Sequence, residues 1–490
     1  MTEALVIAAP ACALLTGAAT WLARTARQAD LLNSAGAVLT ALLTLALAGI
    51  ALTDASHPRH GAWWMLDAAG GVFLAVIAVI GLLSALVAPS QLASSGRGLV
   101  RAARGRGMYY AAYHTFWAAL IVVPLVDNLG LAWLLVEATT GASALLVAYS
   151  GTRGALEAGW KYLVLTTFGL AIAMLGIIVL YVAIAPGDGT LGTLDWQSIA
   201  RAAPGLRGGP AVVAFVLIVA GLATKVGWAP VHNWLPDAHS EAPPPVSALL
   251  SAALLPTVVL VTWRVLIALG PALTPGTASA LVLAFGLVSL AVAVPFLWRS
   301  MAWKRLLAYS SLEHMGILAV GIGFATPLAT AGVVVHVAGH ALAKSLGFYA
   351  AAPLLRHAPR AHDRAVRGLA FANPSTAGAV GVSLGALAAM PPSPLFISEL
   401  LILLGGVAAH EIAVTVAAAL LLALGFLGLA QALVDGLVGE PRVRRWRSGR
   451  SGVRMRRLTL VCGTLLLALT AVACLLPGSG VVTHLMAGIA

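Results

Sequence analysis

The sequence predicts an all-α polytopic membrane protein with about fourteen transmembrane helices. Of its 490 residues, 60% are hydrophobic and only 9% are charged, and the mean hydropathy is +0.96. This composition excludes a soluble globular protein. The apolar residues fall mostly into runs of about 17 to 28 residues, and each run is long enough to cross the hydrocarbon core of a bilayer. Basic residues gather in alternate connections between these runs, which is the pattern that orients membrane helices.

The apolar runs define the predicted spans in chain order. The first run lacks a basic leader and a small-residue cleavage site, so we interpret it as a retained helix and not as a signal peptide. The twelfth run is too long for one straight helix and contains three prolines, so we expect it to be broken. The fourteen spans are 4–23, 32–53, 71–88, 109–127, 129–150, 159–185, 211–235, 246–270, 277–298, 305–325, 328–352, 376–409, 412–435 and 457–476.

The distribution of lysine and arginine predicts the orientation of these spans. The odd-numbered connections, together with the first residues of spans 10 and 14, contain 22 of these residues, and the even-numbered connections contain 3. The positive-inside rule therefore places the odd connections in the cytoplasm and, with fourteen spans, both termini outside. The net charge of +12 does not indicate a nucleic-acid partner, because the basic residues lie at span ends and form no single patch with interleaved aromatic residues.

The seventh span carries the most informative stretch, GLATKVGWAPVHNWLPDAHSEAPPP. Lys225 lies in an apolar helix, where burying an ammonium costs several kcal/mol unless it is paired or functional. Pro230 follows five residues later, so we expect the helix to break beside its own charge. Polar residues, including His232 and His239, come directly after the break. A charged residue beside a broken helix is typical of the ion sites of transporters.

Titratable residues recur at a nearly constant offset along the chain, which predicts an internal repeat. The offset equals five spans, an odd number, so the second copy would cross the membrane in the opposite sense. We therefore expect spans 4–8 and spans 9–13 to form an inverted repeat, with the broken helices 7 and 12 as counterparts. The matching pairs are Glu137 and Glu313, 176 residues apart, Lys161 and His336, 175 apart, and Lys225 and Glu399, 174 apart.

This repeat divides the chain into four segments. We expect a three-helix segment at 1–108, a first five-helix repeat at 109–270, a second, inverted repeat at 277–435, and a basic connection with a last helix at 436–490.

Titratable residues inside the spans are the candidates for proton transfer, because a proton needs hydratable stations to cross hydrocarbon. A simpler alternative applies to Lys161, near the start of its span, whose side chain can reach the interface. Arg264, near the outer end of span 8, is expected to be an interfacial anchor. The candidates are Glu137, Lys161, Lys225, His232, His239, Glu313, His314, His336, His340, Lys344 and Glu399.

No metal or cofactor is expected from the sequence. His336 and His340 are one helical turn apart, but a metal site needs a third ligand, and Lys344 on the same face would repel a dication. The chain has no Gly-rich phosphate loop and no Ser/His/Asp or Cys/His arrangement. Its three cysteines lie in apolar segments and cannot hold an iron–sulfur cluster. We therefore expect no catalytic centre in this chain.

Several motifs resemble the antiporter-like proton-conducting subunits of respiratory complex I, membrane-bound hydrogenases and Mrp-type antiporters. They lie between residues 109 and 435, and LLVEATTGASALL and SSLEHMG are most similar to the component F type of hydrogenase-4-like complexes. The motifs are LLVEATTGASALL, GWKYLVL, TKVGWAPVHNWLPDAHSEAPPPVSALL, KRLLAYSSLEHMG, HVAGHALAKSLGF and PPSPLFISELLIL.

The resemblance implies a function and a set of roles. The protein would translocate protons, or exchange them for Na⁺, as a subunit in the inner membrane of a prokaryote. Its partners would be other membrane subunits and a peripheral hydrogenase or dehydrogenase module. Glu137 would pair with Lys225, within a salt bridge or one water, and Lys344 would link this pair to Glu399. We note one departure from the family and expect a second. Span 8 has Pro256 and no central lysine or histidine, and we expect no long lateral helix after span 14, unlike the distal complex I subunit.

Two alternatives to proton translocation stay open from the sequence. The chain could couple the proton gradient to a partner enzyme such as an inorganic-carbon uptake protein, or it could be a non-conducting scaffold. The line of titratable residues argues against a scaffold, whereas the identity of co-purifying subunits would separate a redox partner from a carbon-capturing one.

Overall fold

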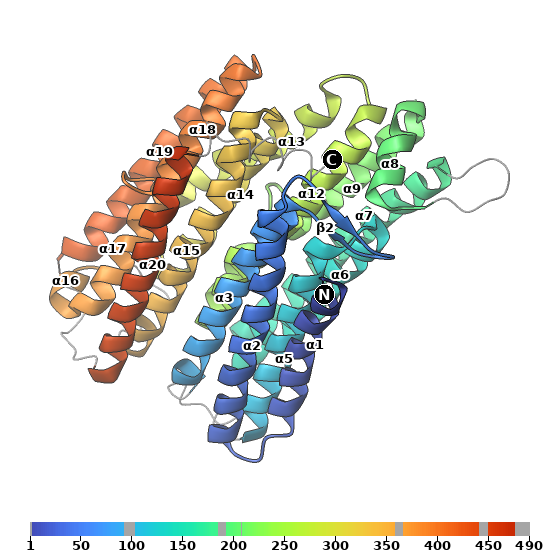
Figure 1. The fold of residues 1–490 in the computed structure, drawn as a ribbon. Helices are drawn as coiled ribbons and strands as arrows, with labels where there is room; N and C mark the ends of the chain where they lie inside the picture. Colours follow the sequence, from blue (N-terminus) through green and yellow to red (C-terminus); the bar gives the residue numbers. More distant parts are fainter. Residues whose placement is uncertain are drawn as a thin grey trace.

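The computed structural model describes residues 2–92, 103–184, 193–206, 208–357, 366–440 and 449–475. Long helices run roughly side by side through the molecule (Figure 1). Helices α16 to α20 gather on one side, helices α6 to α9 lie on the other, and α3 and α15 pack against each other between them.

The N-terminal helices form a bundle with α5. Thr25 caps the second helix, because its side chain accepts a hydrogen bond from the backbone N–H of Gln28. A short antiparallel hairpin, with two residues in each strand, joins the second and third helices and places Arg59 opposite Leu66. The elements are α1 (Thr2–Trp21), α2 (Ala26–Thr53), β1 (Arg59–His60), β2 (Met65–Leu66), α3 (Ala68–Leu92) and α5 (Ala103–Val122).

The middle of the chain supplies the next set of helices, which correspond to spans 5 to 8 of the sequence. They are α6 (Leu129–Val147), α7 (Arg153–Ile184), α8 (Trp196–Ala202), α9 (Gly209–Val226), α10 (Trp234–Glu241), α11 (Pro244–Leu249), a π-helix η4 (Leu250–Leu254) and α12 (Leu255–Leu269). Short 3₁₀ turns follow α5, α6, α8 and α12 at Val123–Leu125, Ala148–Ser150, Ala203–Gly205 and Gly270–Ala272.

The last set corresponds to spans 9 to 14. These helices are α13 (Thr277–Leu297), α14 (Trp303–Phe324), α15 (Pro327–His357), α16 (Leu369–Ala372), α17 (Pro374–Leu387), α18 (Pro394–Ala408), α19 (Ile412–Val438) and α20 (Gly449–Leu475).

The all-α membrane architecture predicted from the sequence is confirmed. In the described part of the chain, 13 helices are long and apolar enough to cross a membrane. The fourteenth predicted span is the broken one, which appears as α17 and α18. These two helices have 14 and 15 residues, and each is too short to cross a bilayer alone. The prediction of about fourteen spans therefore holds when these two helices are counted as one broken span.

Both predicted helix breaks occur, although the first lies earlier than Pro230. Helix α9 ends at Val226 because Gly227 adopts the left-handed conformation, with φ of 79°, which glycine tolerates at a helix C-terminus. The second break follows α17, and α18 begins at Pro394, where Ser393 accepts a hydrogen bond from the N–H of Leu395. Each break leaves helix ends inside the molecule, next to Lys225 in the first case.

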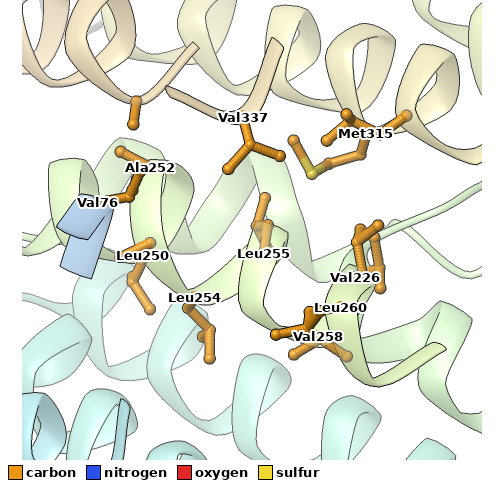
Figure 2. Packing of buried hydrophobic residues seen from close by; sticks show 14 of the residues in the cluster. Val76, Val226, Leu250, Ala252, Leu254, Leu255, Val258, Leu260, Met315 and Val337 are labelled. Carbon is orange, nitrogen blue, oxygen red and sulfur yellow. The ribbon is translucent and has the colours of Figure 1, made fainter. Parts of the chain in front are cut away.

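Span 8 is continuous but irregular at its centre. The N–H of Leu255 bonds to the carbonyl of Leu250, five residues earlier, as in a π-helix. Pro256 follows immediately, and a proline cannot donate the regular bond to the carbonyl four residues earlier. The irregularity therefore has a local cause. Apolar residues of this span, including Leu254 and Val258, join Val226, Met315 and Val337 in one buried cluster (Figure 2).

Arg264 is not the interfacial anchor that its position predicts. Its side chain is 1% exposed, and it donates hydrogen bonds to the Asp67 carboxylate at 2.8 Å and to the carbonyl of Pro124 at 3.0 Å. Asp67 also accepts a hydrogen bond from the N–H of Gly70. This buried ion pair joins the start of α3, the end of α5 and α12, and its loss would leave an unpaired charge inside the molecule.

Candidate functional site

Lys225 lies among buried hydroxyl groups. We call these residues the lysine set: Lys225, Thr140, Tyr162 and Ser143. The Lys225 ammonium is fully buried and donates hydrogen bonds to Thr140 Oγ1 at 2.7 Å and to Tyr162 OH at 2.6 Å. It also lies 4.6 Å from the centre of the Tyr162 ring, within cation–π distance. Tyr162 OH is 2.8 Å from Ser143 Oγ. Helices α6 and α7 thus place two hydroxyl groups against the buried nitrogen of α9, and a third hydroxyl group, that of Ser143, bonds to one of them.

Glu137, the expected partner of Lys225, lies one turn before Thr140 on α6. No ion pair within 4.0 Å joins these two described residues. Instead, Glu137 Oε1 accepts a hydrogen bond from Thr167 Oγ1 at 2.7 Å, while its Oε2 is buried with no hydrogen-bond partner. Glu137 still lies within electrostatic range of Lys225. The hydroxyl of Thr140 therefore takes the position next to the ammonium that a direct pair would give to the carboxylate.

Lys161 lies apart from the buried groups, at the end of the molecule where odd-numbered connections meet. Its side chain is 36% exposed and pairs with Glu157 at 2.5 Å and with Asp237 at 3.6 Å. Asp237 also pairs with Arg305 at 2.9 Å. This geometry matches the simpler alternative for Lys161, a side chain that reaches the interface.

The two histidines after the first break differ in their surroundings. His232 is partly buried in the connection before α10, and its Nδ1 has no hydrogen-bond partner among the described residues. His239, on α10, is fully buried, and neither of its ring nitrogens has a hydrogen-bond partner among the described residues. Its ring stacks on that of Phe348 of α15, with the ring centres 5.4 Å apart. Lys344 and His340 lie within its electrostatic range. His239 is thus a buried titratable group that contacts α15 and lies within electrostatic range of Lys344.

Lys344, also fully buried, is held by α14. Its ammonium donates to the carbonyl of Leu307 at 2.9 Å and to Ser310 Oγ. The next residue of α14, Ser311, lies 2.8 Å from Ser251 in the π-helix of span 8, oxygen to oxygen. Span 8 thus places a hydroxyl, not a titratable group, beside the residues that hold Lys344.

A second group of titratable side chains, the histidine set, comprises His314, His336, His340 and Glu399. His314 Nδ1 is 3.1 Å from His336 Nε2, and His336 Nδ1 is 2.9 Å from Ser398 Oγ. One ligand atom each of His314, His336 and Glu399 lies within 4.8 Å of the others. The ring of His340 is centred 5.1 Å from that of His314. Helices α14, α15 and α18 therefore bring together four of the eleven candidates.

The hydrogen bonds of the histidine set define the tautomers of two neutral rings. Ser398 donates its hydroxyl proton to the carbonyl of Leu395 at 2.8 Å, so it accepts from His336 Nδ1. The other nitrogen of His336 then accepts from His314 Nδ1. This arrangement leaves a lone pair on His314 Nε2, which is buried with no hydrogen-bond partner among the described residues. His314 can therefore accept a proton or bind a cation at that atom.

Glu313 lies next to His314 on α14 but faces α19. It is 4% exposed, and a Cβ atom placed on Gly425 would lie only 1.8 Å from its Oε1. Lys344 and Glu399 both lie within its electrostatic range. The missing side chain at position 425 thus makes the space that this carboxyl group occupies.

Sequence reasoning missed the hydroxyl partners and one buried lysine. Thr140, Tyr162, Ser310 and Ser398 give no signal in a search for charges, since membrane helices use hydroxyl residues for many purposes. Lys304 was counted with the connections, yet it is 4% exposed and donates to the carbonyls of Ser240 and Ala242 at the end of α10. The position of Lys304 at the start of an apolar helix could have indicated its burial, because a lysine there can donate hydrogen bonds to the free carbonyl groups at the end of a neighbouring helix.

Comparison with known proteins places this geometry in context. Residues 126–425 match the family described as NADH:quinone oxidoreductase/Mrp antiporter, TM. The chain is 32% identical over 388 residues to a hydrogenase-4 component F homolog of Methylacidiphilum infernorum, covering 78% of this chain and 80% of the relative.

Two solved structures share the fold of the whole chain. One is a chain in the structure of the membrane-bound sulfane sulfur reductase, an archaeal respiratory membrane complex, with a TM-score of 0.86 at 19% identity, covering 100% of this chain and 97% of the other. The second belongs to the Mrp complex from Dietzia sp. DQ12-45-1b, with a TM-score of 0.80 at 19% identity, covering 100% of this chain and 96% of the other.

Proposed function

Because the chain belongs to the family of NADH:quinone oxidoreductase and Mrp antiporter membrane subunits, we propose that its lysine set and histidine set carry protons through the membrane. The protein is an antiporter-like integral membrane subunit with thirteen helices of spanning length in its described part. Buried titratable groups are costly in such helices. Their grouping into two sets on different helices supports a relay.

The observation that carries this proposal is the environment of Lys225. Its ammonium contacts two neutral hydroxyl groups and no carboxylate within 4.0 Å among the described residues, so the positive charge is solvated but not cancelled. A lysine in this setting can hold a proton while Glu137 is near and release it when that support weakens. Lys225 is therefore the switching group of the first set.

The proposed route continues from Lys225 past His239 to Lys344 and the histidine set. The centre of span 8 contributes apolar side chains to the buried cluster (Figure 2). Proton transfer from the lysine set to the histidine set therefore needs the side chain of His239, the Ser251 and Ser311 hydroxyls, or water. Histidine suits this position because its unperturbed pKa lies near neutrality. From His340 and His314 the proton would pass to Glu399, which is partly exposed.

The partners and the orientation belong to the same proposal. A hydrogenase-4 relative and structural neighbours from respiratory and Mrp complexes support a role beside other membrane subunits and a peripheral enzyme module in a prokaryotic inner membrane. The surplus of basic residues in odd-numbered connections supports cytoplasmic odd connections and outer termini. Exchange of Na⁺ for protons is a variant of this function, whereas gradient coupling to a carbon-uptake enzyme and a pure scaffold are its competitors.

The test replaces the two ends of the route in the assembled complex. Lys225→Ala and Glu399→Ala should assemble normally, since helices accept alanine, yet each should lower proton translocation in vesicles by at least about tenfold. That loss corresponds to about 1.4 kcal/mol in the limiting step. Translocation is measured with a pH-sensitive dye inside the vesicles, after size-exclusion chromatography has established assembly.

The matched control is the variant His114→Gln. His114 is also buried and titratable, but it bonds to Asn33, and both residues lie outside the stretches of sequence that contain the route. The variant should leave translocation unchanged. Full translocation by both alanine variants would contradict the relay and favour a scaffold. Co-purification of a carbonic-anhydrase-like subunit in place of a redox module would favour carbon uptake.

A further inference from the structure

Three metal-ligand side chains from three separate helices meet inside the membrane part of the protein. His314 of α14, His336 of α15 and Glu399 of α18 each place one ligand atom within 4.8 Å of the other two. Imidazole nitrogens with one carboxylate form a common ligand set for zinc and similar ions. We propose that the histidine set is a binding site for a divalent transition-metal ion of the zinc type.

The spacing of the two histidines fits such an ion. His314 Nδ1 and His336 Nε2 are 3.1 Å apart. Zinc–nitrogen bonds of about 2.0 to 2.1 Å in a tetrahedron separate neighbouring ligand nitrogens by about 3.4 Å. A metal ion bound to these two nitrogens would take the place of the shared proton, which would move to the free lone pair of His314 Nε2. Both rings would turn so that their lone pairs converge on the ion. Glu399 is partly exposed, and rotation of its side chain would bring the carboxylate into bonding distance.

His340 supplies the remaining position. Both of its ring nitrogens are buried with no hydrogen-bond partner among the described residues, and its ring centre lies 5.1 Å from that of His314. Buried polar atoms without partners call for an explanation such as water or an ion. A metal bound to His314, His336 and Glu399 would find in His340 either a fourth ligand or a group that holds its water.

There are two reasons in the sequence to expect no metal: a metal site needs a third ligand, and Lys344 would repel a dication. The fold adds two carboxyl groups, Glu399 as a ligand and Glu313 within electrostatic range of Lys344. When ionised, these two carboxylates would balance the two positive charges of a bound zinc ion. In addition, the Lys344 ammonium is held by the Leu307 carbonyl and Ser310 of α14.

Metal binding at this site has a consequence that rests on the proposed function. The ion would occupy the nitrogen lone pairs and the carboxylate through which a proton would pass. Zinc should therefore inhibit proton translocation at the second half of the route, and Lys225 would still be able to load a proton. Binding itself does not depend on the translocation proposal.

The test measures metal binding directly in the purified, assembled complex. After treatment with a chelator, ⁶⁵Zn²⁺ is titrated by equilibrium dialysis into the wild type and into His314→Gln, His336→Gln and Glu399→Gln variants. We expect the wild type to bind one more equivalent than the variants, or each variant to bind that equivalent at least about tenfold more weakly. The control His114→Gln removes a buried histidine elsewhere and should bind as the wild type does.

Translocation by wild-type vesicles is then measured with and without zinc. Equal zinc binding by the wild type and all three variants would overturn the site. Loss of the equivalent in the variants, with zinc inhibition of the wild type, supports both the site and its place on the route. Binding without any translocation in metal-free wild-type vesicles would support the site and contradict the proposed function.

Discussion

At the scale of single residues, Gly425 determines the position of Glu313. A Cβ atom at Gly425 would lie 1.8 Å from Glu313 Oε1, so Gly425→Ala must displace this carboxyl group. The displaced atom is the end of a flexible side chain, and alanine favours helix by about 1 kcal/mol over glycine. We therefore expect the variant to assemble with nearly unchanged stability but to lose at least about half of its proton translocation, measured in vesicles.

The control for Gly425→Ala is Gly463→Ala on α20, where an added Cβ meets nothing within 4 Å. This change should leave both assembly and translocation as in the wild type. Equal translocation by Gly425→Ala and Gly463→Ala would show that the position of Glu313 does not matter for the route.

Residues of the site were predictable from sequence when they carry charge in an apolar helix. Lys225 and Lys344 are both fully buried, as their distance from basic connections predicts. Their partners were not predictable, because Tyr162 and Ser310 lie 63 and 34 residues away along the chain and hydroxyl groups carry no charge signal. The contact of Lys225 with Thr140 instead of Glu137 has the same origin: one helical turn decides which side chain reaches the nitrogen.

At the scale of helices, the close crossing of α7 and α9 positions Lys225. A Cβ atom at Gly221 would lie 2.5 Å from the carbonyl oxygen of Gly169 and 2.5 Å from the backbone nitrogen of Ala173. Small residues allow such close approach in membrane helices. Because backbone atoms cannot move aside as a side-chain end can, Gly221→Ala should push the two helices apart and cost about 1 to 3 kcal/mol.

We expect Gly221→Ala to lower the thermal unfolding midpoint of the complex and, because Lys225 lies one turn away, to lower translocation per assembled complex. Gly141→Ala on α6, with nothing within 4 Å of an added Cβ, serves as the control and should not lower the midpoint. An unchanged midpoint for Gly221→Ala would mean that the crossing can relax.

Helix breaks were predictable in existence but not in position. Proline marked both breaks in the sequence, yet α9 ends at Val226, before Pro230. The next residue, Gly227, adopts the left-handed conformation that terminates a helix. The π-helix of span 8 was not expected, although Pro256 supplies its cause. The hydrophobic pattern identifies apolar helices well, whereas the exact helix ends and the irregular turns within them depend on packing.

At the scale of the whole molecule, composition and run length were enough to predict the all-α membrane fold. The division into segments 1–108, 109–270, 277–435 and 436–490 and the inverted repeat stay predictions. In Figure 1, α8, which follows span 6, and α16, which follows span 11, lie at opposite ends of the molecule. An inverted repeat of five spans requires this placement for equivalent connections.

The orientation of the molecule in the membrane can be tested through these two connections. Gln197 of α8 and Ala370 of α16 are both exposed, so single cysteines at these positions would be accessible to a reagent from the adjoining solution. The protein's own cysteines, Cys12, Cys462 and Cys474, are first replaced by serine or alanine. An impermeant maleimide added to intact cells should label Gln197→Cys, in an even connection, and should label Ala370→Cys, in an odd connection, only after the membrane is opened. Labelling of both positions in intact cells, or of neither, would contradict the inverted repeat, while the reverse pattern would keep the repeat and overturn the predicted outer location of the termini.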